Sequence, residues 1–363
     1  MERLKNNKMK KRAMMKKMVI AAIIAGILGG STPNVFADNV QSINQSTEKI
    51  SDSSFYISTK DAINQTGNYI YNKNKNPNYG SEWNIIGLSR SEVNISNSYY
   101  QEYYNNVVET LKGSNGELNN PTDYSRLILG ITAIGKNASN VEGYNLIEKL
   151  SDFNYIKGQG LNSLVFALIA IDSNQYNIPE VNGEKVQTTR DMIINEILSM
   201  EISTGGWAFF GSKADVDMTA MILQALAKYK NDDRVKPAID RGIDLLSKLQ
   251  NKNGGYESWG SYNCENIAQV VVALTELGIN PKTDERFIKD KSLVDSMMEF
   301  YVDGGGFKHV LSENKPNSMA TEQGMYALVA YERFINGKNS LYNMSDSILN
   351  YNFINKSKNV VNL

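Results

Sequence analysis

The chain has 363 residues, with one cysteine, one histidine, 39 acidic residues and 38 basic residues. A single cysteine excludes an internal disulfide, so a hydrophobic core must stabilise the fold. The first 37 residues hold eight basic residues and one acidic residue, which leaves the remainder with a net charge near −8. Such an acidic chain is not expected to bind nucleic acid or anionic lipid.

Residues 1–37 have the pattern of a secretory signal peptide. A basic segment precedes an apolar stretch at 18–28, and Val35-Phe36-Ala37 offers small residues before a predicted mature N-terminus at Asp38. The apolar stretch is shorter than the roughly 20 residues of a spanning helix. We therefore expect a secreted or cell-surface protein with no stable membrane span after signal removal. An uncleaved N-terminal anchor is the alternative.

Residues 38–55 are rich in Ser, Asn, Gln and Asp and are expected to form a disordered lead-in. Residues 56–340 are expected to form one helical domain, and 341–363 a polar C-terminal tail. Apolar residues recur at spacings of three and four throughout this domain, which is typical of amphipathic helices. The predicted helices are, in chain order, Thr59–Tyr71, Ser81–Ser89, Tyr99–Leu111, Pro121–Ile134, Glu142–Leu150, Gly160–Asp172, Thr188–Met200, Asp215–Tyr229, Val235–Leu249, Asn263–Leu277, Lys291–Tyr301 and Met319–Ile335.

These helices alternate between two kinds of composition. The segments 160–171, 217–226 and 265–274 are almost continuously apolar, whereas 234–250 carries many charges. A helix that is apolar all round is buried, and a helix with one polar face meets water. Six such pairs predict an all-α fold, an (α/α)6 toroid of six helical hairpins in two concentric rings. An open solenoid is the alternative.

A glycine pair followed by an aromatic residue occurs three times, about 50 residues apart, each time ahead of an alanine-rich helix. The copies are Gly205-Gly206-Trp207, Gly254-Gly255-Tyr256 and Gly305-Gly306-Phe307. With Gln250, the second copy resembles the Gln-x-x-x-Gly-x-aromatic repeat of the prenyltransferase and squalene–hopene cyclase superfamily. The resemblance covers residues 200–335 best, and it implies the (α/α)6 toroid with a site at the N-terminal end of the inner helices. The segments 79–90 and 124–136 look like secreted clostridial-type surface proteins that contain this repeat.

Asp215-Val-Asp217-Met218-Thr219-Ala220 resembles the Asp-x-Asp-Asp-Thr-Ala motif of class II terpene cyclases. By this resemblance Asp217 would be the acid that protonates an alkene, with Asp215 as its neighbour, because so weak a base needs a buried carboxylic acid. Met218 replaces the third Asp of the motif. Alternatively, Asp215 is a helix N-cap and Asp217 lies in the first turn, where the helix dipole favours a carboxylate. Along the repeat, Glu265 matches Asp217.

A zinc site is a further reading, because the related protein prenyltransferases bind zinc with Asp, Cys and His. Asp217, Cys264 and His309 are the residues available for such a site. They belong to separate repeats and include no local ligand pair, so we expect no metal and no other cofactor.

The loops between the glycine pairs and their helices are rich in aromatic residues. We expect them to gather at one mouth of the toroid with Asp215, Asp217 and other acids, as an aromatic and acidic rim. Such a rim suits a small apolar, cationic or planar ligand, a sugar, or a cell-surface partner. The alternative is that the aromatics only anchor their loops. The expected ligand-binding residues are Trp207, Phe209, Tyr256, Trp259, Tyr262, Glu265, Phe307, His309 and Glu322.

Three functions stay open at this point. The first is non-catalytic binding of a ligand or surface partner, favoured by the signal and the incomplete acid motif. The second is a terpene-cyclase-like isomerase or lyase that protonates an isoprenoid with Asp217. The third is a secreted carbohydrate-active (α/α)6 enzyme with paired carboxylates such as Asp217 and Glu265. The sequence leaves enzymatic activity undecided and leans towards binding.

Overall fold

The computed structural model describes residues 57–258 and 260–347. The signal peptide and lead-in predicted at 1–55 lie outside these residues. The regular elements, with their bounds, are α2 (Thr59–Lys73), α3 (Glu82–Arg90), α4 (Asn97–Gly113), α5 (Pro121–Ala133), η1 (Leu146–Leu150), α6 (Phe153–Lys157), α7 (Leu161–Asp172), α8 (Arg190–Ser199), α9 (Val216–Leu226), η2 (Ala227–Tyr229), α10 (Lys236–Leu249), β1 (Glu257–Ser258), β2 (Ser261–Tyr262), α11 (Cys264–Leu277), η3 (Glu285–Phe287), α12 (Leu293–Met298) and α13 (Ser318–Ile335). The unit is thus helical, as expected for an all-α fold.

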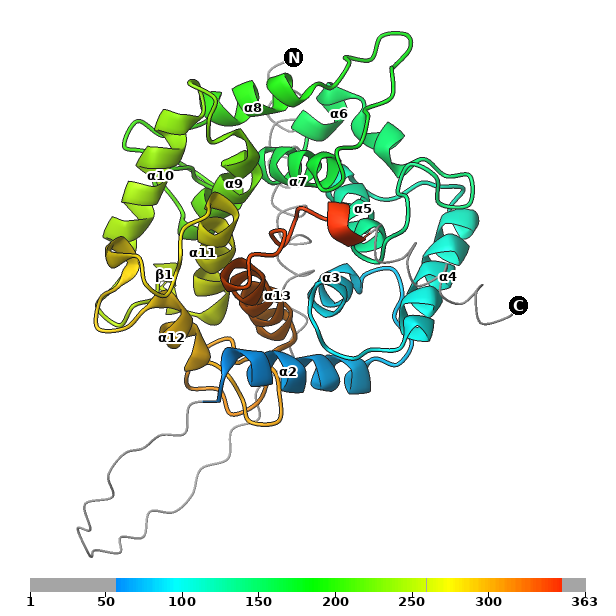
Figure 1. Cartoon of the computed structure of the whole chain (residues 1–363). Coiled ribbons are helices and arrows are strands. Elements are labelled where there is room, and N and C mark those ends of the chain that lie inside the picture. The colour runs from blue at the N-terminus through cyan, green and yellow to red at the C-terminus, as the bar shows by residue number, and fades with distance from the viewer. Residues whose placement is uncertain (1–56, 259, 348–363) are drawn as a thin grey trace, which may run out of the picture. The chain divides into compact units, whose positions relative to one another are not determined.

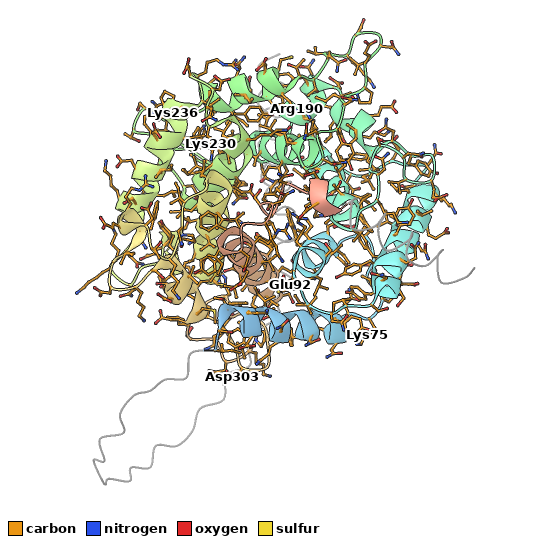
Figure 2. All side chains as sticks on the ribbon, in the orientation of Figure 1. Lys75, Glu92, Arg190, Lys230, Lys236 and Asp303 are labelled. Atoms are coloured by element: carbon orange, nitrogen blue, oxygen red, sulfur yellow. The ribbon has the colours of Figure 1, made fainter. Side chains whose placement is uncertain are left out.

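Six of these helices form an inner ring. α3, α5, α7, α9, α11 and α13 each pack against the next in this order, and α13 packs against α3 (Figure 1). The remaining α-helices lie outside them, and α2, α6, α8, α10 and α12 each pack on an inner helix. The composition explains this order: α7 is buried along most of its length, whereas α10 exposes ion pairs such as Lys236–Asp240. Side chains fill the space between the two sets of helices (Figure 2).

Local sequence signals account for where the helices begin and end. Asn120 caps α5 by accepting a hydrogen bond from the Asp123 backbone, and Pro121 follows as the first helical residue. Asn263 caps α11 in the same way, and Gly278 ends that helix in the left-handed conformation. The predicted bounds of these helices are therefore within one or two residues of those observed.

The clearest differences from the predicted helices lie at residues 142–150 and at the strands β1 and β2. Residues 142–150 were expected to be a helix, but Glu142 and Gly143 have positive φ angles of 51° and 93°, so a turn precedes the short η1. Glu257–Ser258 and Ser261–Tyr262 pair as the antiparallel strands β1 and β2, in which Ser258 lies opposite Ser261. The tip of this hairpin includes Gly260, with φ of 78°.

The glycine pairs let an outer loop approach a neighbouring element closely. Gly206 has φ of 75°, and a β-carbon there would collide with Leu245 of α10 and with Thr219. The same Thr219 hydroxyl accepts a hydrogen bond from the Trp207 backbone at 3.1 Å. Thr321 does the same for Phe307 at 3.0 Å. In the first and third copies of the repeat, a threonine thus ties the loop to the first turn of an inner helix.

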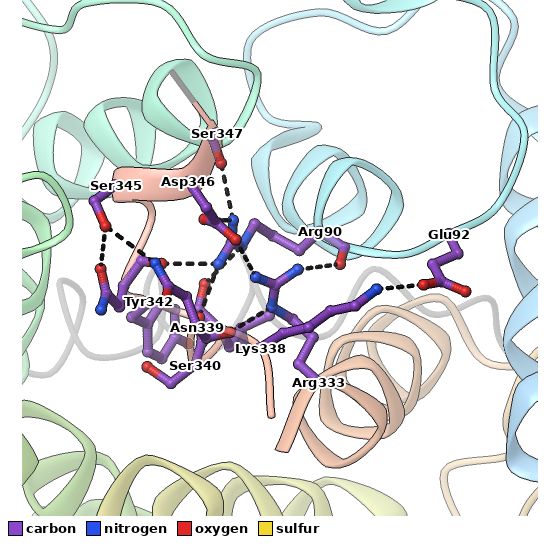
Figure 3. Close-up of polar contacts among 12 residues, drawn as sticks. Arg90, Glu92, Arg333, Lys338, Asn339, Ser340, Tyr342, Ser345, Asp346 and Ser347 are labelled. Atoms are coloured by element: carbon purple, nitrogen blue, oxygen red, sulfur yellow. Dashed lines mark hydrogen bonds and ion pairs between the residues drawn. The ribbon is translucent and has the colours of Figure 1, made fainter. Parts of the chain in front are cut away.

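Residues 338–347 close one end of the inner ring, where the C-terminal ends of α3, α7, α11 and α13 lie (Figures 1 and 3). Leu341, Tyr342 and Met344 are buried, and the Met344 backbone donates to the carbonyl of Ser173, the residue after α7. The prediction of a polar tail from residue 341 does not hold for residues 341–347, because Leu341, Tyr342 and Met344 are apolar and pack into the interior. We call residues 338–347, with Arg90, Glu276 and Arg333, the sealed end.

Arginine side chains bind the closing segment. Arg90 is 4% exposed and donates to the carbonyls of Leu341 (3.1 Å), Ser340 (2.8 Å) and Asn343 (2.8 Å). It also pairs with Asp346, which in turn pairs with Arg333 (Figure 3). Such a buried charge is tolerated only when its hydrogen bonds are satisfied, and here they are.

Candidate functional site at the ring mouth

The opposite end of the inner ring holds the N-termini of the same helices, and it carries the carboxylates that the sequence singles out. We define the ring mouth by five residues from α3, α9, α11 and α13: Trp83, Asn84, Asp217, Glu265 and Glu322. Trp83, Asn84, Asp217 and Glu322 are partly exposed, whereas Glu265 is buried. The N-terminal ends of helices favour negative charge, which suits carboxylates at this end.

Asp215 and Asp217 have different roles at the start of α9. Asp215 is the N-cap, and its Oδ1 accepts a hydrogen bond from the Met218 backbone at 3.0 Å. Its Oδ2 accepts from the Ser258 hydroxyl of the hairpin at 3.3 Å. The helix-capping interpretation is thus correct for Asp215. Asp217 lies one residue into the helix.

The Asn266 amide holds Asp217. With its nitrogen towards Asp217, Asn266 donates to both carboxylate oxygens at 2.7 and 2.8 Å. In that orientation the amide oxygen accepts from the Ser258 backbone and the Asn263 side chain, both at 3.2 Å. The reverse orientation would put two donors against the Asn266 nitrogen, so the neighbours fix the amide as a donor to Asp217.

Opposing effects act on the proton of Asp217. Burial raises the pKa of Asp217 to about 7, and the charges of Asp215 and Glu265 add to the rise. The two hydrogen bonds from Asn266 favour the ionised carboxylate and act against that rise. Burial thus raises the pKa of Asp217, and the neutral Asn266 amide acts in the opposite direction by stabilising the carboxylate.

Glu265 pairs with His309, the next candidate along the repeat. The His309 Nδ1 lies 2.9 and 3.0 Å from the two Glu265 carboxylate oxygens. This hydrogen bond raises the pKa of the imidazole, and partial burial opposes the rise. The His309 carbonyl also accepts from the Cys264 backbone at 3.1 Å. The structure therefore brings Asp217, Glu265 and His309 into one neighbourhood, as the repeat predicted.

Cys264 is a core residue beside them. Its thiol is fully buried, and burial raises the thiol pKa well above its usual value. Within residues 57–258 and 260–347, no three His, Cys, Asp or Glu side chains are placed to hold a metal ion.

The aromatic residues after the glycine pairs are interior residues. Trp207, Tyr256 and Phe307 are each 0% exposed, and the Trp207 indole donates to the Ile197 carbonyl at 2.8 Å. The prediction that these three line an open rim is therefore wrong, and the alternative reading, that they anchor their loops, fits their burial. Their position after a glycine pair could not show which way each ring points.

The other predicted aromatics have mixed surroundings. Phe209 is 40% exposed and packs edge-on against Phe210, with ring centroids 4.5 Å apart. Tyr262 packs against Phe300 on the side of the hairpin, with centroids 5.4 Å apart. Trp259 lies outside the described residues. Of these, Phe209 is the one the structure leaves open to solvent.

Glu322 marks the second half of the mouth. It accepts a hydrogen bond from the Asn84 amide at 2.8 Å, which joins α13 to α3 across 238 residues of sequence. Burial raises the pKa of Glu322 to about 7; the Asn84 hydrogen bond opposes that rise and the charge of Glu82 adds to it. Glu322, which the sequence predicts to be a rim acid, lies in the first turns of α13 and contacts the first turn of α3.

Sequence reasoning missed the aromatic part of the mouth. The Trp83 ring packs against Phe166 of α7 and Tyr326 of α13, with centroids 5.5 and 5.8 Å apart. α3 and α7 are not adjacent in the ring, so the Trp83–Phe166 contact reaches past α5. Burial, above all, raises the pKa of the Tyr326 phenol, and the charges of Tyr342, Glu322 and Asp217 add to the rise. The sequence signal that could have revealed this part of the mouth is the pair Trp83-Asn84 in the first turn of a buried helix.

Amide side chains connect the two halves. Gln269 of α11 donates to the Tyr326 hydroxyl at 2.7 Å and to Gln323 at 2.9 Å. Gln224 of α9 donates to the Gln269 side chain at 2.9 Å. Because glutamine can both donate and accept, this chain links α9, α11 and α13 without adding charge.

One arginine lies beside the mouth and is already paired. Arg126 of α5 contacts Glu82 at 2.8 Å and Asp123 at 3.2 Å. Burial raises the pKa of Glu82, and the Arg126 charge opposes that rise. In the part of the chain that the structure describes, no lysine or arginine forms an ion pair with Asp217 or Glu322.

Part of the chain that includes α9 and α11 matches a known protein family. Residues 181–295 match the family model of the squalene-hopene cyclase C-terminal domain. The match runs from before α8 into α12 and includes Asp215, Asp217 and Glu265, and it supports a relationship with the terpenoid cyclase and prenyltransferase-like proteins. No curated protein matches the chain. Among the described helices, none is long and apolar enough to span a membrane.

Proposed function

We propose that the chain is an (α/α)6 toroid that binds a ligand at the ring mouth without transforming it. The closed cycle of inner helices, the outer helices packed on them and the family match support the toroid. Because residues 338–347 lie across the other end, we infer that a ligand would bind at the mouth. The partly exposed Trp83, Asp217 and Glu322 would meet that ligand.

The observation that carries the non-catalytic proposal is the Asn266 amide. A carboxylic acid that protonates an alkene must present its proton to the substrate in a dry site. Here both Asp217 oxygens face one amide donor, whose orientation is fixed from behind by Ser258 and Asn263. That arrangement stabilises the carboxylate and occupies the oxygens from which the proton would leave.

The rest of the acid motif serves the fold. Met218, at the place of the third Asp of the motif, is 1% exposed and part of the core. Thr219 accepts from the Trp207 backbone and anchors the loop. The third carboxylate of the motif is thus missing, and the Thr219 hydroxyl is already engaged in anchoring the loop.

A direct test is native mass spectrometry of the purified protein, followed by incubation with squalene and geranylgeranyl diphosphate. We expect a co-purified or added small molecule to bind in a 1:1 ratio and both isoprenoids to be recovered unchanged. Cyclised product formed by the wild type and absent with Asp217→Asn would contradict this proposal.

The second candidate is a class II terpene-cyclase-like activity with Asp217 as the acid. The observation that favours it is the pKa of about 7, which leaves a proton on Asp217 at neutral pH. Product formation in the same incubation, with a rate that falls as pH rises through 7, is its signature. Glu322→Gln shows which of the two acids donates the proton. Because Glu322 lies outside the acid motif, turnover that depends on Asp217 should persist in this variant.

We propose further that the protein acts outside the cytoplasm as a secreted or surface protein of the clostridial type. The basic, apolar and small-residue segments of residues 1–37 support this. Mass spectrometry of the protein recovered from culture medium should give a chain that begins at Asp38. Full-length chain found only inside cells would contradict export.

A further inference from the structure

A cavity of about 270 Å³ lies between the outer helix α2 and the C-terminal half of the inner helix α13, which pack against each other. Its volume is close to the lower end of small-molecule sites, roughly 300 Å³. The segment that follows α3 completes the wall. The side chains used below are Lys60, Ile63, Asn64, Val329, Glu332 and Arg333. The ring-mouth residues do not line this cavity, so it is a separate place in the fold.

Two lysines share one carboxylate at the edge of the cavity. Glu92 pairs with Lys338 through one oxygen, and the Lys60 ammonium lies 3.8 Å from the other (Figure 3 shows the first pair). The hydrogen bond and charge of Lys338 lower the pKa of Glu92, and the charge of Lys60 adds to that effect. Lys60 therefore has the weaker hold on Glu92 and is the lysine that can turn to a ligand.

Arg333 brings hydrogen-bond donors to the same wall. It is 8% exposed, and its Nε donates to the Asn339 carbonyl at 2.7 Å. Its Nη1 donates to the Arg90 carbonyl at 3.0 Å, and its Nη2 donates to Asp346. A guanidinium has five N–H groups, so two of them have no partner within residues 57–258 and 260–347. Buried donors of this kind are normally satisfied, and a carboxylate is their best acceptor.

Glu332 presents the opposite charge from the preceding position of α13. One of its oxygens accepts from the Thr59 hydroxyl, and the other accepts from the Asn336 amide at 3.3 Å. Both partners are neutral. In the described part of the chain no basic side chain forms an ion pair with Glu332, because the two lysines of the cavity lie against Glu92 instead. An acid and a base thus line the cavity from neighbouring positions of one helix.

Apolar side chains form the rest of the wall. Ile63 of α2 is 5% exposed and Val329 of α13 is 1% exposed. Asn64 is partly exposed and has no hydrogen-bond partner among the described residues. The cavity therefore combines a positive, a negative and an apolar surface within a small volume.

We propose that this cavity binds an α-amino acid with a small apolar side chain. The ligand carboxylate would accept from Arg333 and Lys60, its ammonium group would donate to Glu332, and its side chain would contact Ile63 and Val329. An α-amino acid carries both charges on one carbon atom, which suits an acid and a base at adjacent positions of a helix. A simple carboxylate would meet repulsion from Glu332, and a simple amine would meet repulsion from Arg333 and Lys60. This site goes beyond the function proposed for the ring mouth and does not depend on it.

Three molecules of similar shape test the two charges separately. Leucine carries both, 4-methylpentanoic acid lacks the ammonium group, and 3-methylbutan-1-amine lacks the carboxylate. Isothermal titration calorimetry of the purified protein with each one compares their affinities at neutral pH. We expect leucine to bind at least about tenfold more tightly than either analogue, because only leucine makes both charged contacts.

Glu332→Gln gives a result that loss of structure cannot imitate. The variant keeps a side chain that can accept from Thr59 and Asn336, and it removes the charge. It should weaken leucine about tenfold and at the same time strengthen 4-methylpentanoic acid, because the repulsion of the carboxylate disappears. Glu109→Gln is the matched control, since Glu109 forms an exposed pair with Lys112 on α4, and it should change neither affinity.

Two further variants test the position of the ligand. Lys60→Met should weaken leucine and 4-methylpentanoic acid by about threefold each and leave the amine unchanged. Asn64→Phe fills the cavity without removing a hydrogen bond within the described residues, so it should abolish leucine binding. Circular dichroism checks that each variant is folded.

The outcomes separate this site from the ring mouth. Equal affinity for leucine and its two analogues, no binding of any of them, or unchanged leucine binding by Asn64→Phe overturns the amino-acid site. Leucine found at the ring mouth in a crystal structure also overturns it and favours the mouth instead. If the molecule that native mass spectrometry identifies lies in this cavity while the mouth is empty, the amino-acid site stands and the function proposed for the mouth fails.

Discussion

The two ends of the inner ring use charge in opposite ways. At the sealed end Arg90 and Arg333 are buried, paired with Asp346 and bonded to the carbonyls of the closing segment. At the ring mouth the Asn266 amide holds Asp217 and the Asn84 amide holds Glu322, and neither acid forms an ion pair within the described residues. Burial raises the pKa of each to about 7. Buried charges whose ion pairs and hydrogen bonds are complete stabilise the fold, whereas carboxylates without an ion pair can gain interaction energy from a ligand.

The largest expected effect is at the sealed end. Arg90→Met should lower the free energy of unfolding by about 3–5 kcal/mol, because it leaves Asp346 and three carbonyls without their buried donor. Urea denaturation followed by circular dichroism measures the change. Arg241→Met is the control, since Arg241 forms an exposed pair with Glu201 and should cost about 0–1 kcal/mol. Equal losses in the two variants would mean that the sealed end is not specially stabilised.

The loops that carry the glycine pairs depend on close backbone packing rather than on buried ion pairs. Gly206→Ala should destabilise the protein by about 2–4 kcal/mol, since it adds a collision with Leu245 to the strain of a positive φ angle. Gly260→Ala has a similar φ angle of 78° but open space around it, so about 1 kcal/mol is expected. Thermal unfolding of both variants separates crowding from strain. A loss for Gly260→Ala as large as that for Gly206→Ala would contradict the packing role.

The mouth should also make stability depend on pH. The folded pKa of Asp217, about 7, lies above the ordinary value of 3.8, so the folded state holds the extra proton between these values. The contribution of Asp217 to the free energy of unfolding is therefore largest below pH 3.8, its ordinary pKa, and it is lost as pH rises through 7. Asp217→Asn should reduce the fall in Tm between pH 5 and pH 8. Glu322 and His309 act with the same sign, so part of the slope should remain.

The smallest effect should come from neutralising Glu322. Glu322→Gln removes an unpaired, partly buried charge and keeps the hydrogen bond from Asn84, so at pH 8 the protein should be as stable as the wild type or up to about 1 kcal/mol more stable. Chemical denaturation at pH 8 and pH 5 tests this, with no gain expected at pH 5. A destabilised variant at pH 8 would show that the Glu322 charge serves the fold rather than a ligand.

Most of the helices could be predicted because their signals are local. Asn263 and Gly278 mark both ends of α11, and Asp215 marks the start of α9. The prediction failed at Glu142, where a residue common in helices adopts a positive φ angle imposed by the turn around it. The closing segment was missed because Leu341, Tyr342 and Met344 are too few to form a helical pattern, yet ring closure buries them.

The site could be predicted only in part. The repeat register places Glu265 beside Asp217, and that neighbourhood is present. The convergence of Asn84 with Glu322, and of Trp83 with Phe166, depends on the ring closing between α13 and α3, which no local pattern encodes. The inward direction of Trp207 is likewise set by a hydrogen bond to Ile197 in a preceding helix.

The most direct test of ligand binding at one end of the ring is a crystal structure of the protein with the small molecule that native mass spectrometry identifies. We predict density for the ligand at the ring mouth, over Trp83 and against the carboxylates of Asp217 and Glu322, with residues 338–347 unchanged at the sealed end. Ligand density at the sealed end with an empty mouth, or displacement of residues 338–347 by the ligand, would contradict this account.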